Sequence, residues 1–177
     1  MSLWFLDACA LINLYASGRL AEVARHVQGP LLVVPKVVEE AGWIFERVGL
    51  ERGERQPIDL APFMDKGLIQ VVPLTPTAHQ SFLDLAYRID DGEAMTIAAA
   101  LASEEAGVVT DDEAARRLLD SSGMPMSITS LSLLRAALTG CEQGDLREAL
   151  INVMVCGRYV PGSRHPEWVW WQKIFSI

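Results

Sequence analysis

The sequence predicts an α/β fold with a mostly parallel central sheet. Short apolar runs that are typical of buried strands alternate with longer segments of helical pattern. The strand-like runs lie at residues 3–6, 31–34, 69–72, 108–110 and 126–129. Strands that alternate with helices form βαβ units, in which the strands are parallel and helices cover the sheet. With 177 residues, half of them hydrophobic, the chain is long enough for one domain with a substantial core.

The helices expected between these strands begin at recognisable residues. Pro35 suits the first turn of a helix, where a backbone N–H would lack a helical partner anyway. One side of this helix would carry an apolar stripe made of Val37, Ala41, Ile44 and Val48. Thr75 and Pro76 mark the start of another helix, which runs toward Ile89. Residues 92–106 are apolar almost all round, which predicts a buried helix.

One stretch lies outside this alternating pattern. Residues 49–62 are rich in charged side chains and are interrupted by glycine and proline. Such a composition is typical of a connection that runs over the protein surface rather than of a buried strand or helix. We therefore expect residues 49–62 to form a surface loop, which could border the mouth of an active site.

The composition limits the classes of function. A formal charge of −8 argues against a broad basic surface for nucleic acid, although a carboxylate pocket that holds divalent cations can still receive phosphate. Cys9, Cys141 and Cys156 lack paired zinc spacing and form no even disulfide set, so we expect a cytoplasmic protein. The apolar start is interrupted by Asp7 and no Lys or Arg precedes Arg19, which argues against a signal peptide. No apolar run reaches the roughly 18–20 residues that span a bilayer.

Acidic residues cluster where strands end and helices begin. The four clusters are Asp7; Glu39 with Glu40; Asp90, Asp91 and Glu93; and Asp111 with Asp112. The carboxyl ends of parallel strands share one edge of the sheet, where ligands bind, so Asp7 and Asp112 could meet there. Carboxylates without accompanying histidines suit Mg²⁺ or Mn²⁺ better than zinc. Their mutual repulsion at one edge would be relieved by such cations.

Each cluster also has an ordinary structural explanation. A carboxylate directly after a strand is most often a helix N-cap. Asp90 and Glu93 have the spacing of a capping box. On a helical wheel, Glu40 lies at the border of the apolar stripe whereas Glu39 points nearly opposite, so Glu40 is the better ligand candidate.

In the order and spacing of these residues, the chain resembles the PIN-domain ribonucleases, including the VapC-like toxins of toxin–antitoxin pairs. The resemblance covers about residues 3–139. The matching segments are Leu6-Asp7-Ala8-Cys9-Ala10-Leu11-Ile12, Pro35-Lys36-Val37-Val38-Glu39-Glu40, Asp91-Gly92-Glu93-Ala94 through Ile97-Ala98, and Val109-Thr110-Asp111-Asp112 followed by Ala115-Arg116. One departure is Ala8, which stands where many relatives carry Ser or Thr and therefore removes a hydroxyl contact.

The resemblance implies a PIN-like three-layer α/β/α fold over residues 1–140 and an endoribonuclease that depends on Mg²⁺ or Mn²⁺. It also implies a set of site residues: Asp7, Glu40, Glu93 and Asp112 as metal-binding and catalytic carboxylates, Asp111 as a close competitor of Asp112, and Thr110 as a supporting residue. The implied partners are an RNA substrate and, for a toxin, an antitoxin protein.

Residues 141–177 lie beyond the clear resemblance. We expect this extension, with its cluster Trp168-Val169-Trp170-Trp171, to pack onto the domain or to form a homodimer or antitoxin interface. Other single residues have ordinary structural explanations. We expect His26, His79 and His165 at surface or core positions, and Cys9 as a small buried side chain. Arg116 and Arg117 are expected to be a solvated pair on a helix, although they could instead contact RNA phosphate.

Two other functions compete with the nuclease. A non-catalytic PIN-like interaction module would have lost its metal, although all four carboxylates are present. A phosphate-transfer enzyme on a similar sheet is the second alternative. A haloacid-dehalogenase-type site would need a second Asp two residues after Asp7, where Cys9 stands instead.

Overall fold

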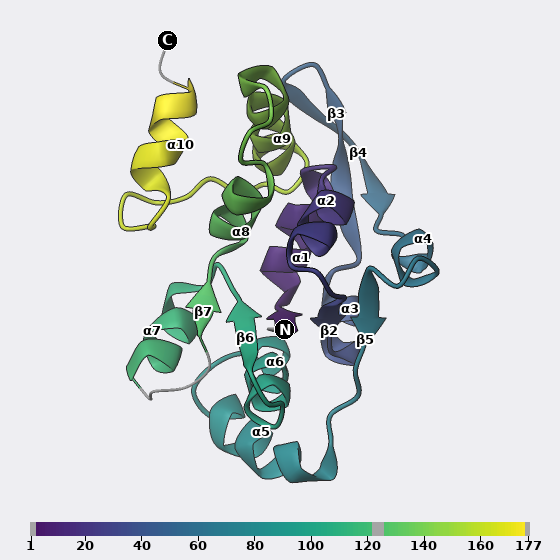
Figure 1. Ribbon diagram of the computed structural model, residues 1–177, viewed down its shortest axis with the longest axis vertical. Coiled ribbons are helices and arrows are strands. Elements are labelled where there is room, and N and C mark those ends of the chain that lie inside the picture. Colours follow the sequence, from purple (N-terminus) through teal and green to yellow (C-terminus); the bar gives the residue numbers. More distant parts are fainter. Residues whose placement is uncertain (1–2, 122–125, 176–177) are drawn as a thin grey trace.

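The computed structural model describes residues 3–121 and 126–175, and within them a five-stranded parallel sheet runs through the centre (Figure 1). The strand order is β5-β2-β1-β6-β7. The strands are β1 (Leu3–Leu6), β2 (Leu31–Val33), β5 (Ile69–Val71), β6 (Ala106–Val109) and β7 (Ser127–Ile128). Each pair of neighbours is parallel, for example Leu6 beside Val109 and Leu32 beside Gln70. The predicted strands are thus confirmed, with ends shifted by one or two residues.

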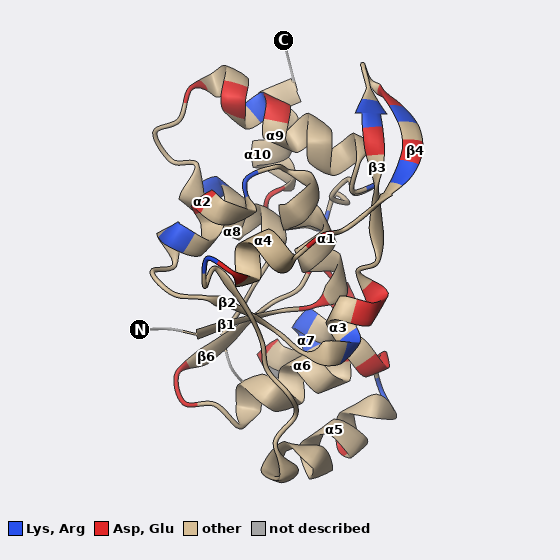
Figure 2. Cartoon of the chain, turned by 90° about the vertical axis from the view of Figure 1, so that its right-hand side faces the viewer, with Lys and Arg blue, Asp and Glu red and all other residues tan. Residues whose placement is uncertain are grey.

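Helices cover both faces of this sheet, which confirms the three-layer α/β/α architecture. Figures 1 and 2 show α1 (Ala8–Ala16), α2 (Leu20–His26), α8 (Ser130–Ala137) and α9 (Gln143–Val155) on one side. On the other side lie α5 (His79–Ala86) and α6 (Asp91–Leu101), and α6 contacts β1, β6 and the short helix α3 (Pro35–Glu40). The remaining helices are α4 (Ala61–Met64), the 3₁₀ helix η1 (Pro76–Ala78), α7 (Glu113–Ser121) and α10 (Trp168–Phe175).

The core forms where the apolar strands meet these helices. Phe5 and Leu6 of β1 and Val109 of β6 are fully buried, as continuous apolar runs in a two-sided sheet require. Helix α6 is buried from Ala94 through Ala100 except for the half-buried Met95, so its all-round apolar pattern correctly predicted its position. It ends at Leu101 rather than near Ala106, because that residue already begins β6.

Two local predictions are wrong at the same place. The helix that begins at Pro35 ends at Glu40, and Ala41 leaves helical geometry with φ −81° and ψ 53°. The chain then forms an antiparallel hairpin from β3 (Trp43–Val48) and β4 (Glu51–Pro57), so residues 49–62 are not simply a loop. Gly49 makes the tight turn with φ +67°, a conformation that favours glycine. A two-stranded ribbon exposes both faces, and charged side chains therefore do not argue against a strand here.

The C-terminal segment packs on the sheet's helical layer. Leu150 and Val153 of α9 are fully buried, and α9 contacts α1 and β3. Helix α10 lies at the edge of the molecule beside α8 and α9 (Figure 1), and its Trp171 is only 5% exposed. Across the described residues, no helix is both long and apolar enough to cross a membrane.

Candidate active site

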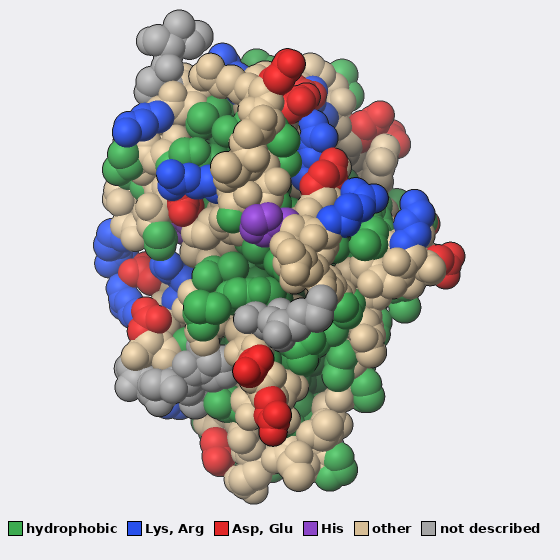
Figure 3. Space-filling view, in the orientation of Figure 1, with side chains coloured by type: hydrophobic (Ala, Val, Ile, Leu, Met, Phe, Trp, Pro, Cys, Tyr) green, Lys and Arg blue, Asp and Glu red, His purple; other side chains and the backbone are tan. Residues whose placement is uncertain are grey.

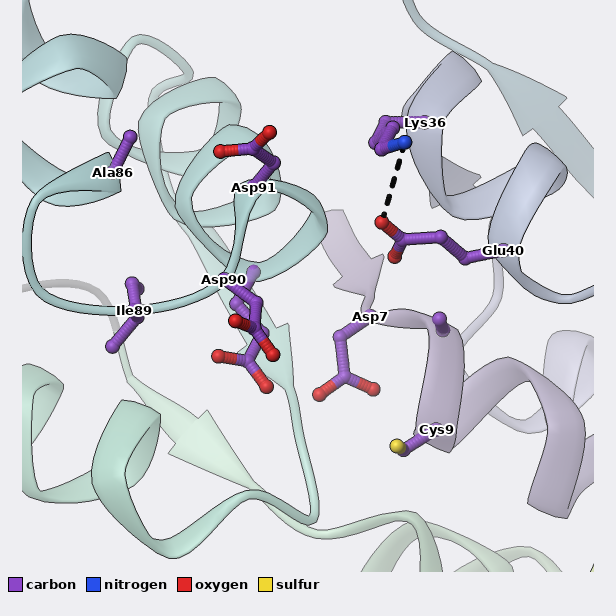
Figure 4. A pocket seen from close by; sticks show the side chains of 10 residues that line it. Asp7, Cys9, Lys36, Glu40, Ala86, Ile89, Asp90 and Asp91 are labelled. Atoms are coloured by element: carbon purple, nitrogen blue, oxygen red, sulfur yellow. Dashed lines mark ion pairs between the residues drawn. The ribbon is translucent and has the colours of Figure 1, made fainter.

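An acidic cavity of about 480 Å³ opens at the carboxyl edge of the sheet, between α1, α3 and α6 (Figure 4). Three of the predicted ligands, Asp7, Glu40 and Glu93, line this cavity. Asp90, Asp91 and Lys36 line it as well. Figure 4 shows Asp7, Glu40 and Asp90 around one space, whereas the carboxylate of Asp91 points away from Asp7. The strand order therefore brings together acidic groups that lie far apart along the chain, whereas Asp112, the fourth predicted ligand, is not among the residues that line this cavity.

Asp7 stands directly after β1 and divides its two carboxylate oxygens between different surroundings. Its Oδ1 accepts a hydrogen bond of 2.6 Å from the backbone N–H of Ala10 and so caps α1. Its Oδ2 is buried and has no hydrogen bond of normal geometry within the described residues, although the side chain of Thr110 interacts with this carboxylate. Burial raises the pKa of Asp7 from 3.8 to about 7, and Asp111 and Glu93 add to the rise, against the opposing effects of Thr110 and Ala10.

Glu40 reaches the cavity through a close contact between α3 and α6. A Cβ atom added at Gly92 would lie 2.1 Å from Oε2 of Glu40, so the glycine makes room for this carboxylate. Oε1 of Glu40 lies 3.7 Å from Nζ of Lys36, which also stands 3.8 Å from Glu39. The Glu39 side chain is 72% exposed, twice as much as that of Glu40, and does not line the cavity.

Glu93 lies in the first turn of α6 and faces the other acidic groups. Burial raises the pKa of Glu93 from 4.5 to about 7, with further increases from Asp112, Asp90 and Glu40 against the opposing backbone N–H of Asp90. The side chain of Asp90 makes no capping hydrogen bond, but the backbone N–H of Asp90 interacts with the Glu93 carboxylate, so the glutamate half of the predicted capping box is present.

The structure separates the roles of Asp111 and Asp112. Asp112 stands before α7 and accepts a hydrogen bond of 2.7 Å from Ala115, while its own N–H donates to Thr110 Oγ1. Asp111 accepts hydrogen bonds from the N–H and hydroxyl of Ser130 and from Nδ2 of Asn13, at 2.8 Å for the last. More of the Asp111 carboxylate is therefore engaged by the protein itself.

Several neighbours of this site carried no recognisable signal in the sequence. Asn13 and Ser130 meet at Asp111 only because α1 and α8 pack together. His165 is 8% exposed, and its Nε2 lies 3.8 Å from Asp111 Oδ1. Cys9 is exposed on the cavity wall rather than buried, because the start of α1 faces the cavity. The walls of the cavity still remove part of the water around the sulfur, and this desolvation, followed by the charges of Asp7 and the other nearby carboxylates, raises the pKa of the Cys9 thiol to about 12, so the thiol stays protonated.

The donor atoms of the cavity fit a hard divalent cation. The unpartnered oxygen of Asp7 and the two raised carboxyl pKa values show buried acidic groups without sufficient positive charge nearby. Across residues 3–121 and 126–175, no three Asp, Glu, His or Cys side chains already form a ligand group. The carboxylates would therefore have to turn toward an ion on binding.

A family model described as a PIN domain matches residues 3–164, which is most of the chain. The match extends past residue 139, to which the resemblance could be followed in the sequence. No curated protein matches the chain.

Proposed function

The chain belongs to the PIN-domain family, and from this premise we propose that it is a metal-dependent endoribonuclease. It would hydrolyse RNA phosphodiester bonds with Mg²⁺ or Mn²⁺ held at the sheet edge. One observation carries this proposal: Asp7, whose Oδ2 is buried without a hydrogen bond of normal geometry, lines a cavity together with further carboxylates. A buried polar atom without a partner is costly unless a ligand satisfies it.

The proposed ion site uses the four carboxylates that the family resemblance implies. Asp7, Glu40, Glu93 and Asp112 would hold the ion, which when bound lowers the pKa of a water and stabilises developing negative charge. Asp111 would act mainly as a positioning residue, since it ties Ser130 at the start of α8 to Asn13 in α1. Asp7 and Glu93, with pKa values raised to about 7, would release their protons as the ion arrives.

The RNA substrate and the protein partners belong to this proposal. A toxin role, an antitoxin partner, a homodimer and a cytoplasmic location follow from the family resemblance and the composition. Light scattering of the purified protein tests the dimer, because a monomer has a mass of 19.5 kDa. Co-expression with the product of a neighbouring small reading frame, followed by a cleavage assay, tests the antitoxin.

The decisive experiment compares wild type with Asp7→Asn on labelled RNA. Wild type should cleave with Mn²⁺ or Mg²⁺ and stop on addition of EDTA, whereas Asp7→Asn should be inactive. An isosteric amide keeps an oxygen that can accept from Ala10, so the fold should survive. Cleavage by wild type in excess chelator would reject the metal mechanism. A folded wild type that binds Mn²⁺ but cleaves no RNA would favour the phosphate-transfer alternative. A folded wild type that binds no metal would favour the non-catalytic interaction module.

A further inference from the structure

The hairpin of β3 and β4 sorts its side chains onto two different faces. The register shifts between Phe45 and Arg47, where an irregularity interrupts the regular pairing. As a result, Arg52 and Arg55 lie on the same face although they are three residues apart. Both guanidinium groups lie over aromatic rings of β3. The guanidinium carbon of Arg55 is 3.9 Å from the ring centre of Trp43, and the guanidinium carbon of Arg52 is 5.8 Å from the ring centre of Phe45.

A third arginine joins this face from the end of α9. Arg158 is exposed, and its guanidinium lies 5.8 Å from the ring centre of Phe45. The backbone N–H of Phe45 donates to the carbonyl of Cys156, which fixes the hairpin against this segment. We define the arginine face as Trp43, Phe45, Arg52, Arg55 and Arg158. Within the described chain, its three arginines form no ion pair with an acidic side chain.

The acidic side chains of the hairpin lie on the opposite face. A Cβ at Gly53 would lie 3.1 Å from Val48 and 3.3 Å from Glu46, which places those two side chains together. Glu51 pairs with Val48 across the hairpin, so it shares their face. Glu54 precedes Arg55 and therefore points away from the arginine face. Arg47, the cross-strand neighbour of Arg52, is already paired with Glu148 of α9.

Basic and acidic side chains are separated onto different faces at the hairpin, whereas they are mixed elsewhere on the protein. Figure 2 shows the hairpin at the edge of the molecule, and the face seen in Figure 3 carries acidic and basic side chains side by side. The formal charge of −8 opposes the approach of a polyanion in general. A polyanionic substrate therefore needs a confined cationic surface near the active site.

The arginine face is continuous with the acidic cavity. A second hollow of about 280 Å³ is lined by Glu40 together with Trp43, Gly157 and Arg158. Glu40 thus borders both hollows, and the chain passes from Glu40 to the start of β3 at Trp43 within three residues. A strand that leaves the active site over Glu40 would reach the arginine face directly.

We propose that the arginine face binds the single-stranded RNA substrate beside the scissile bond. Guanidinium groups that lie over aromatic rings keep their N–H donors for phosphates, and their planes and the ring edges offer stacking surfaces for unpaired bases. A face of three cations and two half-buried aromatics, beside which Glu148 is already paired with Arg47, matches a flexible polyanion better than a neutral protein partner. This inference rests on the proposed ribonuclease function.

Fluorescence anisotropy with a labelled single-stranded RNA tests the proposal, in an Asp7→Asn background so that no cleavage occurs. The double variant Arg52→Ala/Arg55→Ala should bind about tenfold or more weakly, since a charge-assisted hydrogen bond contributes about a factor of ten. The slope of log Kd against log salt should fall by about 0.7 for each phosphate that the variant no longer neutralises. Arg52→Lys/Arg55→Lys should recover part of the affinity.

The matched control is Arg25→Ala/Lys66→Ala, which removes two exposed cations outside the hairpin. This control should bind RNA like its parent. Equal RNA affinity of the hairpin variant and its parent would overturn the proposal. Equal binding of poly-glutamate and RNA would also overturn it, in favour of an acidic protein segment as the partner. If wild type cleaves RNA with a KM that the hairpin variant leaves unchanged, only this inference fails. If wild type cleaves no RNA but binds it through these arginines, only the nuclease proposal fails.

Discussion

At the scale of single residues, Asp7 shows why a structural explanation and a functional one need not compete. One oxygen caps α1 and the other is buried without a hydrogen bond of normal geometry, while the residue lines the cavity. The sequence could place Asp7, Glu40 and Glu93 at one edge, because strand ends and helix starts are local features. It could not rank Asp111 against Asp112, since the difference depends on Asn13 and Ser130, which belong to other helices.

The first prediction compares two neighbouring glutamates of α3. Glu40→Gln should lower kcat/KM by about a hundredfold or more, since even residues that only support metal ligands contribute about ten- to a hundredfold. Glu39→Gln should leave kcat/KM within about twofold and stability within about 0.5 kcal/mol, because its side chain is 72% exposed. Both substitutions remove one charge near Lys36. Equal losses in a cleavage assay on one RNA would show that Glu40 is not a ligand.

At the scale of elements, the sequence predicted best those parts whose burial is uniform. The strands β1 and β6 and helix α6 are buried almost throughout, so their apolar runs are unambiguous. The region after Glu40 was misread because Ile44 and Val48 continue a helical spacing across the end of the helix. Only the backbone at Ala41, and the pairing of β3 with β4, decide that these residues form a strand.

The contact between α3 and α6 gives the second prediction. Gly92→Ala should stabilise the start of α6 by up to about 1 kcal/mol, because alanine favours helix over glycine. It should nevertheless impair Mn²⁺ binding and cleavage about tenfold or more, since the new Cβ would lie 2.1 Å from Glu40 Oε2 and displace that carboxylate. Calorimetric Mn²⁺ titration and a thermal melt measure the two effects separately.

Gly144→Ala is the matched control for that substitution. Gly144 occupies the same second position of helix α9, and a Cβ there would meet nothing within 4 Å. This variant should show the gain in stability without any loss of Mn²⁺ binding. If Gly92→Ala binds Mn²⁺ as tightly as Gly144→Ala does, the space beside Gly92 is not needed for Glu40 to bind the ion.

Helix α10 gives the third prediction. Trp171 is 5% exposed and belongs to the core, so Trp171→Ala should cost about 3 kcal/mol or more. For a chain of this length that lowers Tm by about 6 °C or more. Val169→Ala, at a position 61% exposed, should change stability by no more than about 0.5 kcal/mol. A single calorimetric transition with this lower Tm would make the C-terminal segment part of one cooperative unit. An unchanged Tm for Trp171→Ala would instead support a separate extension after residue 140.

At the scale of the whole molecule, the fold gathers acidic groups at an edge that it also uses for capping. Asp7, Asp112 and Thr129 each follow a strand and accept from the first turn of the next helix. Capping needs an acceptor but no charge cluster, as Thr129 demonstrates. The extra carboxylates Glu40, Asp90 and Glu93 add repulsion, although Glu93 also interacts with the backbone N–H of Asp90 at the start of α6. Their accumulation has a cost in the metal-free protein, and this cost makes stability depend on pH.

The last prediction concerns that dependence. Asp7 and Glu93 have folded-state pKa values of about 7 against ordinary values of 3.8 and 4.5, so between about pH 4 and 7 the folded state binds more protons than the unfolded state. The stabilising effect of these protons is fully present below about pH 4 and is lost as the pH rises through 7. In EDTA, Tm should therefore fall between pH 5 and 8 more in wild type than in Asp7→Asn, because asparagine does not titrate.

Mn²⁺ should reverse the sign of this trend. The ion binds the deprotonated carboxylates of the folded state, so its stabilising effect grows as the pH rises. In millimolar Mn²⁺, the difference in Tm between wild type and Asp7→Asn should therefore increase from pH 6 to 8, whereas in EDTA it should decrease. Differential scanning fluorimetry of both proteins in both buffers measures this. Parallel pH curves with and without Mn²⁺ would mean that no ion binds at Asp7, and the crowded carboxylates would then need a protein or solvent partner instead.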